Sequence, residues 1–390
     1  SPIIVTNWAT WRSCSDFGTL YSNSALKPFA TFSCATGVAG GSGSFLFSGC
    51  LSARFCFFCF FSWSCPTPTR QQGRPMRILV TGGAGFLGSH LCELFLARGD
   101  TVVCLDDLSS GRRSNIEPLT SSSRFTFVEA CVLDPIDVEG EFEGVVHLAS
   151  PASPRLYLMK PIFTLRTGAE GTRNVLEFAR AKSARFILAS TSEVYGEPLI
   201  HPQSETYWGN VNPAGPRSVY DEAKRYAEAL TTTYRSTYGV DTGIVRIFNT
   251  YGPRMRPDDG RVVSSFIDQA LRRAPLTVFG DGRQTRSLCY VDDLVRGIAA
   301  MLGSREAGPI NLGNPVELRV REIAELVRVL TGSTSRIELH PLPQDDPTRR
   351  RPDITLARER LGWSPRVAVR EGVARTIAWH QQALKEALAS

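Results

Sequence analysis

The chain has 390 residues, of which 42% are hydrophobic and 21% charged, a composition typical of a globular protein with a large core. Its net charge of +6 is small for this length, and its longest basic run is Arg349-Arg350-Arg351, so we expect no nucleic acid partner. The four cysteines after residue 75 lack metal-ligand spacing. We therefore expect no metal site, and interpret these cysteines as buried, reduced thiols.

Residues 1–75 differ in composition from the rest of the chain. They are rich in Ser, Phe, Cys and Gly and hold six of the ten cysteines. The first methionine, Met76, directly precedes the first predicted strand, so we expect Met76 to be the initiator and 1–75 to be upstream sequence. The alternative is a membrane anchor over 45–63, although Arg54 would cost about 2.5–3.5 kcal/mol inside a bilayer.

From Arg77 onward, predicted strands alternate with predicted helices, the pattern of a parallel sheet covered on both faces. The predicted strands span 77–80, 101–105, 125–128, 144–149, 184–190 and 242–248. The predicted helices span 88–98, 163–181 and 218–238. We therefore expect an α/β fold with a Rossmann-like, doubly wound parallel sheet. It divides into the extension over 1–75, a domain over 76–250 and a smaller lobe over 251–390.

A glycine-rich loop follows the first predicted strand. Gly82, Gly85 and Gly88 have the spacing G-x-x-G-x-x-G between that strand and the next helix. Glycines at such a turn let the backbone approach a pyrophosphate, and the helix N-terminus supplies free N–H groups. The loop predicts a bound dinucleotide, and a plain glycine-rich turn is the alternative.

Asp106 and Asp107 end the second predicted strand. An acid at this place accepts hydrogen bonds from the adenosine ribose and disfavours a 2′-phosphate. The sequence therefore predicts NAD as the cofactor, with NADP as a minor alternative because Arg112 and Arg113 follow closely.

Tyr220 and Lys224 lie four residues apart and share one face of a predicted helix. We expect the ammonium group to lower the pKa of the phenol from about 10, so that Tyr220 takes a proton from a hydroxyl as hydride leaves the carbon. Thr191 and Glu193 follow the predicted strand over 184–190, at the edge where ligands bind in such sheets. Thr191 is expected to bond the reacting hydroxyl, and Glu193 to act as an acid, a base or an orienting group.

Several stretches of the main body closely resemble the UDP-glucuronic acid decarboxylases (UDP-xylose synthases) of the extended short-chain dehydrogenase/reductase superfamily. The resemblance runs from about Arg77 to about His380. The stretches that carry it are 147–154, 191–196, 246–255, 259–263 and 344–347, together with Arg350 and 352–354.

The resemblance implies a reaction in three steps. Tyr220, helped by Lys224 and Thr191, takes the C4 hydroxyl proton while hydride moves from C4 to NAD. The 4-keto acid then loses carbon dioxide, and finally C5 is protonated and hydride returns to C4, which gives UDP-xylose and recycles NAD. The resemblance assigns Glu193 and Arg286 to the carboxylate and C5.

The resemblance also implies binding residues and an assembly. The NAD-binding set is Gly82, Gly85, Phe86, Leu87, Gly88, Asp106, Asp107, Ser109, Ser110, Gly111, Val132, Leu148, Ser150, Thr167, Ala189, Tyr220, Lys224 and Thr250. For the substrate, UDP-glucuronate, the resemblance assigns Asn249, Arg261, Phe279, Gln284 and Arg350 to the UDP portion. Independently of the resemblance, a guanidinium fork suits a diphosphate or a carboxylate, so Arg166, Arg180, Arg261, Arg286 and Arg350 are candidates for the substrate, and Asn174 completes the predicted set. The predicted helices over 163–181 and 218–238 resemble those that form a homodimer in this family.

Two positions depart from the family pattern. Cys131 replaces an aspartate that would bond the adenine amine, so we expect weaker NAD binding. Gly168 replaces an asparagine inside a predicted helix, at a cost of about 1 kcal/mol relative to alanine.

Three alternatives to decarboxylation stay open: a nucleotide-sugar 4-epimerase, a 4,6-dehydratase, and a catalytically inactive protein that binds NAD and a nucleotide sugar. Ser192 stands where a dehydratase has an acid, and the intact set of Thr191, Glu193, Tyr220 and Lys224 argues against an inactive protein. If Met76 is the initiator we expect a cytoplasmic enzyme. If 45–63 is an anchor we expect a Golgi membrane protein with a lumenal catalytic domain.

Overall fold

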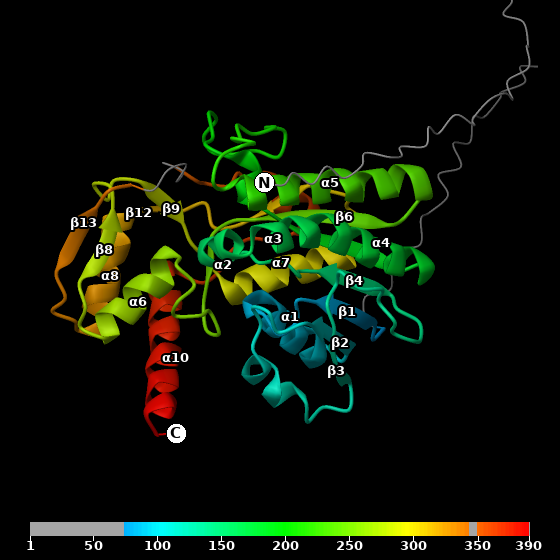
Figure 1. Cartoon of the computed structure of the whole chain (residues 1–390), viewed down its shortest axis with the longest axis horizontal. Coiled ribbons are helices and arrows are strands. Elements are labelled where there is room, and N and C mark those ends of the chain that lie inside the picture. Colours follow the sequence, from blue (N-terminus) through cyan, green and yellow to red (C-terminus); the bar gives the residue numbers. More distant parts are fainter. Residues whose placement is uncertain (1–73, 343–348, 390) are drawn as a thin grey trace, which may run out of the picture. The chain divides into compact units, whose positions relative to one another are not determined.

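The computed structural model describes residues 74–342 and 349–389 (Figure 1). The chain divides into two compact units, Ser1–Pro66 and Thr67–Ser390, and all described residues belong to the second. The expected anchor over 45–63 and nearly all of the N-terminal extension lie outside the described residues. No helix within the described ranges combines the length and the apolar character needed to cross a membrane.

The main body is built on a seven-stranded parallel sheet with the strand order β11-β6-β5-β4-β1-β2-β3. Its strands are β1 (Arg77–Thr81), β2 (Thr101–Asp106), β3 (Phe125–Glu129), β4 (Gly144–His147), β5 (Arg185–Thr191), β6 (Thr242–Ile247) and β11 (Ile310–Leu312). The strand order reverses at β1, which lies between β2 and β4, so a ligand crevice is expected at the carboxyl ends of these strands. All six predicted strands of this sheet are confirmed to within about three residues.

Helices cover both faces of the sheet (Figure 1). One face packs against α1 (Phe86–Ala97) and α7 (Val291–Gly303), and the other against α4 (Thr172–Ala181) and α5 (Ser218–Tyr238). Each face of the sheet is covered by its own hydrophobic core, and successive residues of a strand point into the two cores alternately. In β1, Ile78 and Val80 belong to one core and Leu79 to the other. A strand that is buried on both faces must be apolar throughout, and this explains the continuous apolar runs in the sequence.

A smaller lobe lies beside the sheet and is built from the second half of the chain (Figure 1). Strand β8 pairs in parallel with β13, and β9 pairs antiparallel with β12. The lobe contains α6 (Val262–Leu271), β8 (Leu276–Phe279), β9 (Thr285–Ser287), β12 (Glu317–Arg319), α8 (Val320–Thr331), β13 (Ile337–His340) and α10 (Val369–Ala389). The chain returns to the main sheet between these elements, because α7 and β11 both follow β9 in sequence. The second half of the chain therefore builds the lobe and also completes the sheet.

The predicted helix over 163–181 is divided by a π-helical turn, η3 (Thr167–Gly171), which joins α3 (Pro161–Arg166) to α4. Gly168 lies in this turn against α5, where an added Cβ would come within 2.7 Å of the Ala223 Cβ and 2.9 Å of the Ala223 carbonyl oxygen. The glycine therefore permits the close packing of the two helices, and the asparagine of the family pattern does not fit this backbone.

We expect Gly168→Asn to lower the free energy of unfolding by about 1–3 kcal/mol, since the new side chain overpacks the contact with Ala223. Adding Ala223→Gly removes one obstacle and is expected to restore part of the loss. Chemical denaturation of both variants measures this. An equal loss with and without Ala223→Gly would show that the Ala223 Cβ is not the obstacle.

Candidate active site

A cavity of about 800 Å³ lies at the carboxyl edge of the sheet, between the glycine loop and the smaller lobe. Most of the residues predicted from the sequence line it. They are Gly82, Gly85, Phe86, Leu87, Gly88, Asp106, Asp107, Ser109, Ser110, Val132, Leu148, Ser150, Thr167, Ala189, Thr191, Glu193, Tyr220, Lys224, Asn249, Thr250, Arg261, Phe279, Gln284, Arg286 and Arg350.

The glycine loop leaves no room for side chains on its inner surface. Gly82 adopts a positive φ of 71°, and its N–H donates to the Leu105 carbonyl at 2.8 Å. A Cβ on Gly88 would lie 2.1 Å from the Gly82 carbonyl oxygen, so only glycine lets α1 begin this close to the loop. The result is an exposed helix N-terminus above a tight turn, which fits a pyrophosphate.

Asp106 braces this loop from the next strand. Its buried carboxylate accepts hydrogen bonds from the backbone N–H groups of Ala84 (3.0 Å) and Leu108 (2.8 Å). Burial raises the pKa of Asp106, and these two N–H donors oppose the rise. Gly111, predicted to bind NAD, lies behind Asp106, where a Cβ would come within 2.8 Å of the carboxylate. The loop and an acid at the ribose position together fit NAD.

Cys131 lies at the same end of the cavity. It is half-buried and forms a hydrogen bond with Asp107, and burial raises the pKa of its thiol. The cysteines at 92, 104, 131 and 289 are all free, as expected for reduced thiols.

Tyr220 and Lys224 project from α5 into the cavity. The Tyr220 hydroxyl is hydrogen-bonded to Thr191, and the Lys224 ammonium donates to the Ala189 carbonyl at 2.9 Å. Burial raises the pKa of Tyr220 to about 12, opposed chiefly by Arg261, and burial lowers the pKa of Lys224 to about 8. Our expectation of a lowered Tyr220 pKa is therefore wrong for this structure, because burial outweighs the charges around the phenol.

Tyr157, which was not predicted from the sequence, packs against Tyr220. It belongs to α2 (Pro154–Met159), and its ring stacks on that of Tyr220 with centroids 5.1 Å apart and planes 6° apart. Tyr157 is almost fully buried and lines the cavity, so it fixes the orientation of the Tyr220 ring.

Glu193 is held between two arginines. Its Oε1 lies 2.7 Å from Nη1 of Arg350, and its Oε2 lies 3.0 Å from Nη2 of Arg217. Burial alone would raise the pKa of Glu193, but the two guanidinium groups outweigh burial and lower this pKa to about 2. Glu193 is therefore a fixed carboxylate that orients two cations, and of the three roles predicted for it the structure favours orientation over proton transfer.

Arg350 itself is only 2% exposed and makes two further contacts. Its Nη2 donates to the Gly196 carbonyl at 2.8 Å and its Nη1 to the Ser192 hydroxyl at 3.3 Å. The resemblance assigned Arg350 to the UDP moiety and Arg286 to the region of Glu193. The structure instead pairs Arg350 with Glu193, and places Arg286 on β9 next to Gln284, where it donates to the Thr285 carbonyl.

Three residues predicted to bind substrate lie outside the cavity. Arg166 is exposed and forms an ion pair with Glu170, and Arg180 pairs with Glu177 on the outer face of α4. Asn174 donates from Nδ2 to the carbonyl oxygens of Val132 (3.0 Å) and Leu133 (2.9 Å), so it tethers the loop that carries Val132 into the cavity. The structure therefore does not bring these three side chains to the cavity, because each points to solvent or to a neighbouring loop.

The ion pairs of Glu193 predict a pH effect on stability. Because the two guanidinium groups lower its pKa on folding from 4.5 to about 2, Glu193 stabilises the folded protein above pH 4.5, and this contribution is lost as the pH falls toward 2. We expect Glu193→Gln to lower the free energy of unfolding at neutral pH, and the difference from the parent protein to shrink below pH 4.5.

Urea denaturation across this pH range measures the effect. Glu170→Gln is the matched control, because it removes an ion pair at the surface, where such pairs contribute little. A difference that stays constant from neutral to acid pH would contradict the ionised state assigned to Glu193.

Comparison with known proteins agrees with this geometry. The sequence matches the NAD dependent epimerase/dehydratase family over residues 78–313. It is 50% identical over 303 residues to UDP-glucuronic acid decarboxylase 1 of Arabidopsis thaliana, covering 78% of this chain and 69% of that protein. It is 48% identical over 309 residues to UDP-glucuronic acid decarboxylase 1 of Danio rerio, covering 79% of this chain and 73% of that protein.

Solved structures of the same family superpose on most of the chain. UDP-glucuronic acid 4-epimerase from Bacillus cereus, determined with UDP-glucuronic acid and NAD, is 31% identical with a TM-score of 0.71, and the match covers 79% of this chain and all of that one. DesIV of Streptomyces venezuelae, a dTDP-glucose 4,6-dehydratase determined with NAD, is 29% identical with a TM-score of 0.73, covering 80% of this chain and 98% of that one. The chain is an enzyme of the NAD-dependent epimerase/dehydratase family.

Proposed function

We propose that the protein converts UDP-glucuronate to UDP-xylose and carbon dioxide with an NAD that is recycled. The observation that carries this proposal is the pair of guanidinium groups, Arg350 and Arg217, fixed by Glu193 in the cavity that also holds Tyr220. Guanidinium groups bind carboxylates with good geometry, so this pair of arginines suits a second carboxylate supplied by the sugar. The curated relatives named as UDP-glucuronic acid decarboxylases support the same activity.

Tyr220 is the base of the first step. With a pKa of about 12 it is a neutral phenol at physiological pH, so it must lose its own proton before it can accept the proton of the C4 hydroxyl. Its hydrogen bond with Thr191 and the nearby charge of Arg261 both favour the phenolate. The glycine loop and Asp106 would hold NAD, which would supply the acceptor and later the donor of the C4 hydride.

Loss of carbon dioxide follows from the chemistry of the sugar. Once C4 is a ketone, the carboxylate at C5 lies β to it, and the electron pair released with carbon dioxide is held on the C4 oxygen beside Tyr220. We assign Arg350 and Arg217 to orient that carboxylate. Arg286, with Gln284 and Phe279, lines the part of the cavity formed by the smaller lobe, so we assign it to the UDP moiety.

Incubation of the purified protein with UDP-glucuronate tests the proposal. We expect carbon dioxide and UDP-xylose with no net change in NAD. UDP-galacturonate without carbon dioxide would instead show a 4-epimerase, as in the Bacillus cereus relative that binds the same sugar nucleotide. A dehydratase needs an acid at the position of Ser192, and a serine hydroxyl is too weak an acid for that role.

We also propose that the protein is a homodimer through the helices α3–α4 and α5. The neighbouring surface exposes large apolar side chains, among them Met159 (67% exposed), Ile162 (68%) and Tyr226 (52%). Exposed apolar side chains gathered on packed helices are typical of a protein interface. Light scattering tests this, and we expect Ile162→Asp to shift the protein toward a monomer.

For the compartment we propose the cytoplasm, since the four described cysteines are free thiols. The alternative, a Golgi membrane protein with a lumenal catalytic domain, requires the stretch 45–63. N-terminal sequencing of the native protein decides between the two.

A further inference from the structure

The loop over 197–216 joins η4 (Ser192–Tyr195) to α5, and one of its residues, Gln203, is fully buried. Gln203 lies against the segment 349–353, and so next to Arg350 in space although far from it in sequence. A fully buried glutamine is unusual unless its polar atoms are hydrogen-bonded, and those of Gln203 are.

Gln203 bonds the backbone that directly follows Arg350. Its backbone N–H donates to the Arg351 carbonyl at 2.9 Å, and its own carbonyl accepts from the Asp353 N–H at 2.8 Å. Its side-chain Oε1 accepts from the Arg351 N–H at 2.8 Å, while its Nε2 donates to the Ile200 carbonyl at 2.8 Å. Three of its four polar groups therefore bond the backbone just after Arg350, and the fourth bonds the loop that carries Gln203.

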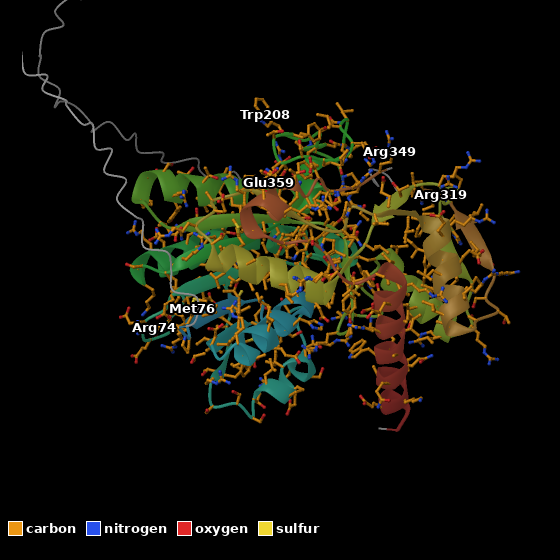
Figure 2. All side chains as sticks on the ribbon, turned by 180° about the vertical axis from the view of Figure 1, so that it is seen from behind. Arg74, Met76, Trp208, Arg319, Arg349 and Glu359 are labelled. Atoms are coloured by element: carbon orange, nitrogen blue, oxygen red, sulfur yellow. The ribbon has the colours of Figure 1, made fainter. Side chains whose placement is uncertain are left out.

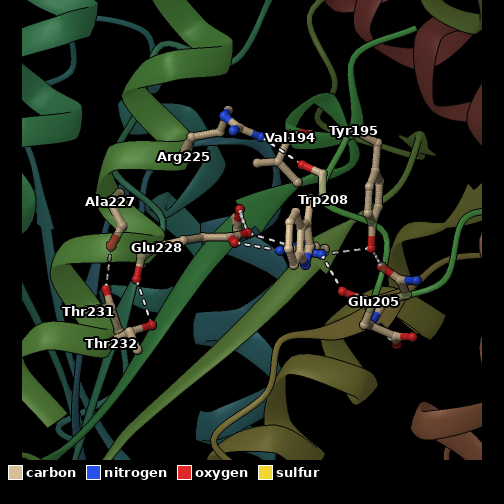
Figure 3. Close-up of polar contacts among 12 residues, drawn as sticks. Val194, Tyr195, Glu205, Trp208, Arg225, Ala227, Glu228, Thr231 and Thr232 are labelled. Carbon is tan, nitrogen blue, oxygen red and sulfur yellow. Dashed lines mark hydrogen bonds and ion pairs between the residues drawn. The ribbon is translucent and has the colours of Figure 1, made fainter. Parts of the chain in front are cut away.

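The loop that carries Gln203 is itself fastened on two sides. His201 Nε2 lies 2.9 Å from Oε2 of Glu317 on β12, and Glu205 Oε1 accepts from the Asn311 N–H of β11 at 2.8 Å. Figure 3 shows the neighbouring contacts, in which Arg225 of α5 donates to the carbonyl oxygens of Val194 (3.2 Å) and Trp208 (3.0 Å). Gln203 thus sits in a rigid frame that joins the sheet to the smaller lobe.

We propose that Gln203 is a positioning residue that sets the place of the Arg350 guanidinium, and through it the preference for a sugar that carries a carboxylate. The inference rests on the proposed function, because it uses the assignment of Arg350 to that carboxylate. Without the Gln203 side chain the Arg351 N–H loses its buried acceptor, so the segment relaxes and Arg350 loses its fixed distance to Glu193.

The test compares two ligands that differ at one group, UDP-glucuronate and UDP-glucose, by calorimetry in a Tyr220→Phe background that stops turnover. The variant is Gln203→Met, which keeps the side-chain volume and removes both side-chain hydrogen bonds. We expect it to weaken UDP-glucuronate binding about tenfold, the scale of one hydrogen bond to a charged group, and to change UDP-glucose binding less than about twofold. Arg350→Ala is expected to show the same selectivity.

A double-mutant cycle measures the coupling free energy between Gln203 and Arg350 in UDP-glucuronate binding. A merely structural role of Gln203 would give no such coupling. If Gln203 acts through Arg350, then Gln203→Met has no further effect on UDP-glucuronate binding in the Arg350→Ala background. An equal loss for both ligands, the same factor in both backgrounds, or an unchanged affinity would each overturn the proposal.

Further variants distinguish an effect on Arg350 from a general disturbance of the loop or of folding. Trp208→Ala changes the same loop at its tip, where the side chain is 89% exposed (Figure 2), and is expected to leave both affinities unchanged. Gln203→Asn, which keeps an amide but shortens its reach, replaces Gln203→Met if the melting temperature shows that the latter does not fold. If the wild-type protein releases no carbon dioxide, the proposed function fails, whereas the Gln203 inference is decided by ligand preference alone.

Discussion

Tyr220→Phe is expected to lower kcat for UDP-xylose formation by about 10²- to 10⁴-fold, the range measured for the loss of a general base. The change removes only the hydroxyl that is bonded to Thr191, while the ring keeps its stack on Tyr157. Binding of NAD and of UDP-glucuronate should therefore stay within a few-fold of the parent protein. Rates of carbon dioxide release and ligand affinities, measured side by side, separate the two effects.

Tyr226→Phe is the matched control for this prediction. Tyr226 lies on the same helix with 52% of its surface exposed, so the loss of its hydroxyl is expected to leave kcat unchanged. Unaltered xylose output from Tyr220→Phe would mean that another group takes the C4 proton.

Gly88→Ala is expected to weaken NAD binding by about 100-fold. The added Cβ would lie 2.1 Å from the Gly82 carbonyl oxygen and 2.6 Å from the Gly83 Cα, and both neighbours are backbone that cannot rotate away. Overpacking of this kind costs about 1–3 kcal/mol, which at its upper end corresponds to that factor. The measurement is the NAD affinity of the purified protein, together with its melting temperature.

Gly303→Ala serves as the comparison for this substitution. Gly303 ends α7 with nothing within 4 Å of an added Cβ, and we expect no loss of NAD affinity there. Tight NAD binding by Gly88→Ala would show that the loop rearranges, and that the close approach of α1 is not what forms the cradle.

The parts of the fold and site that were predicted correctly depend on local patterns. Apolar runs predicted the strands, and the spacing of the glycines predicted the glycine loop. The interval of four residues predicted that Tyr220 and Lys224 share one helix face. The partners of Glu193 did not follow from any local pattern, because Arg350 comes from a segment 157 residues further along the chain. Only the fold brings the two together.

Two expectations from the sequence are not supported by the structure, and both depend on how neighbouring elements bury or expose a side chain. The pKa of Tyr220 was expected to fall because Lys224 was near, yet the sequence does not reveal the desolvation that raises this pKa. Arg166 and Arg180 were expected at the substrate because a guanidinium fork suits a diphosphate or a carboxylate, yet both lie on outward faces of their helices. Which face of an element is covered is decided by its neighbours rather than by its own residues.

The return of the chain to the sheet at β11 has a consequence for biogenesis. About 60 residues separate the end of β6 from β11, and the two strands are neighbours in the sheet. A ribosome must therefore release the first part of the smaller lobe, α6, β8 and β9, before the sheet gains its last strand. A fragment that stops near residue 250 lacks both β11 and α7. The cofactor-binding sheet is therefore complete only when the second half of the chain has been synthesised. We expect the two fragments obtained by dividing the chain near residue 250 to be insoluble when each is expressed alone.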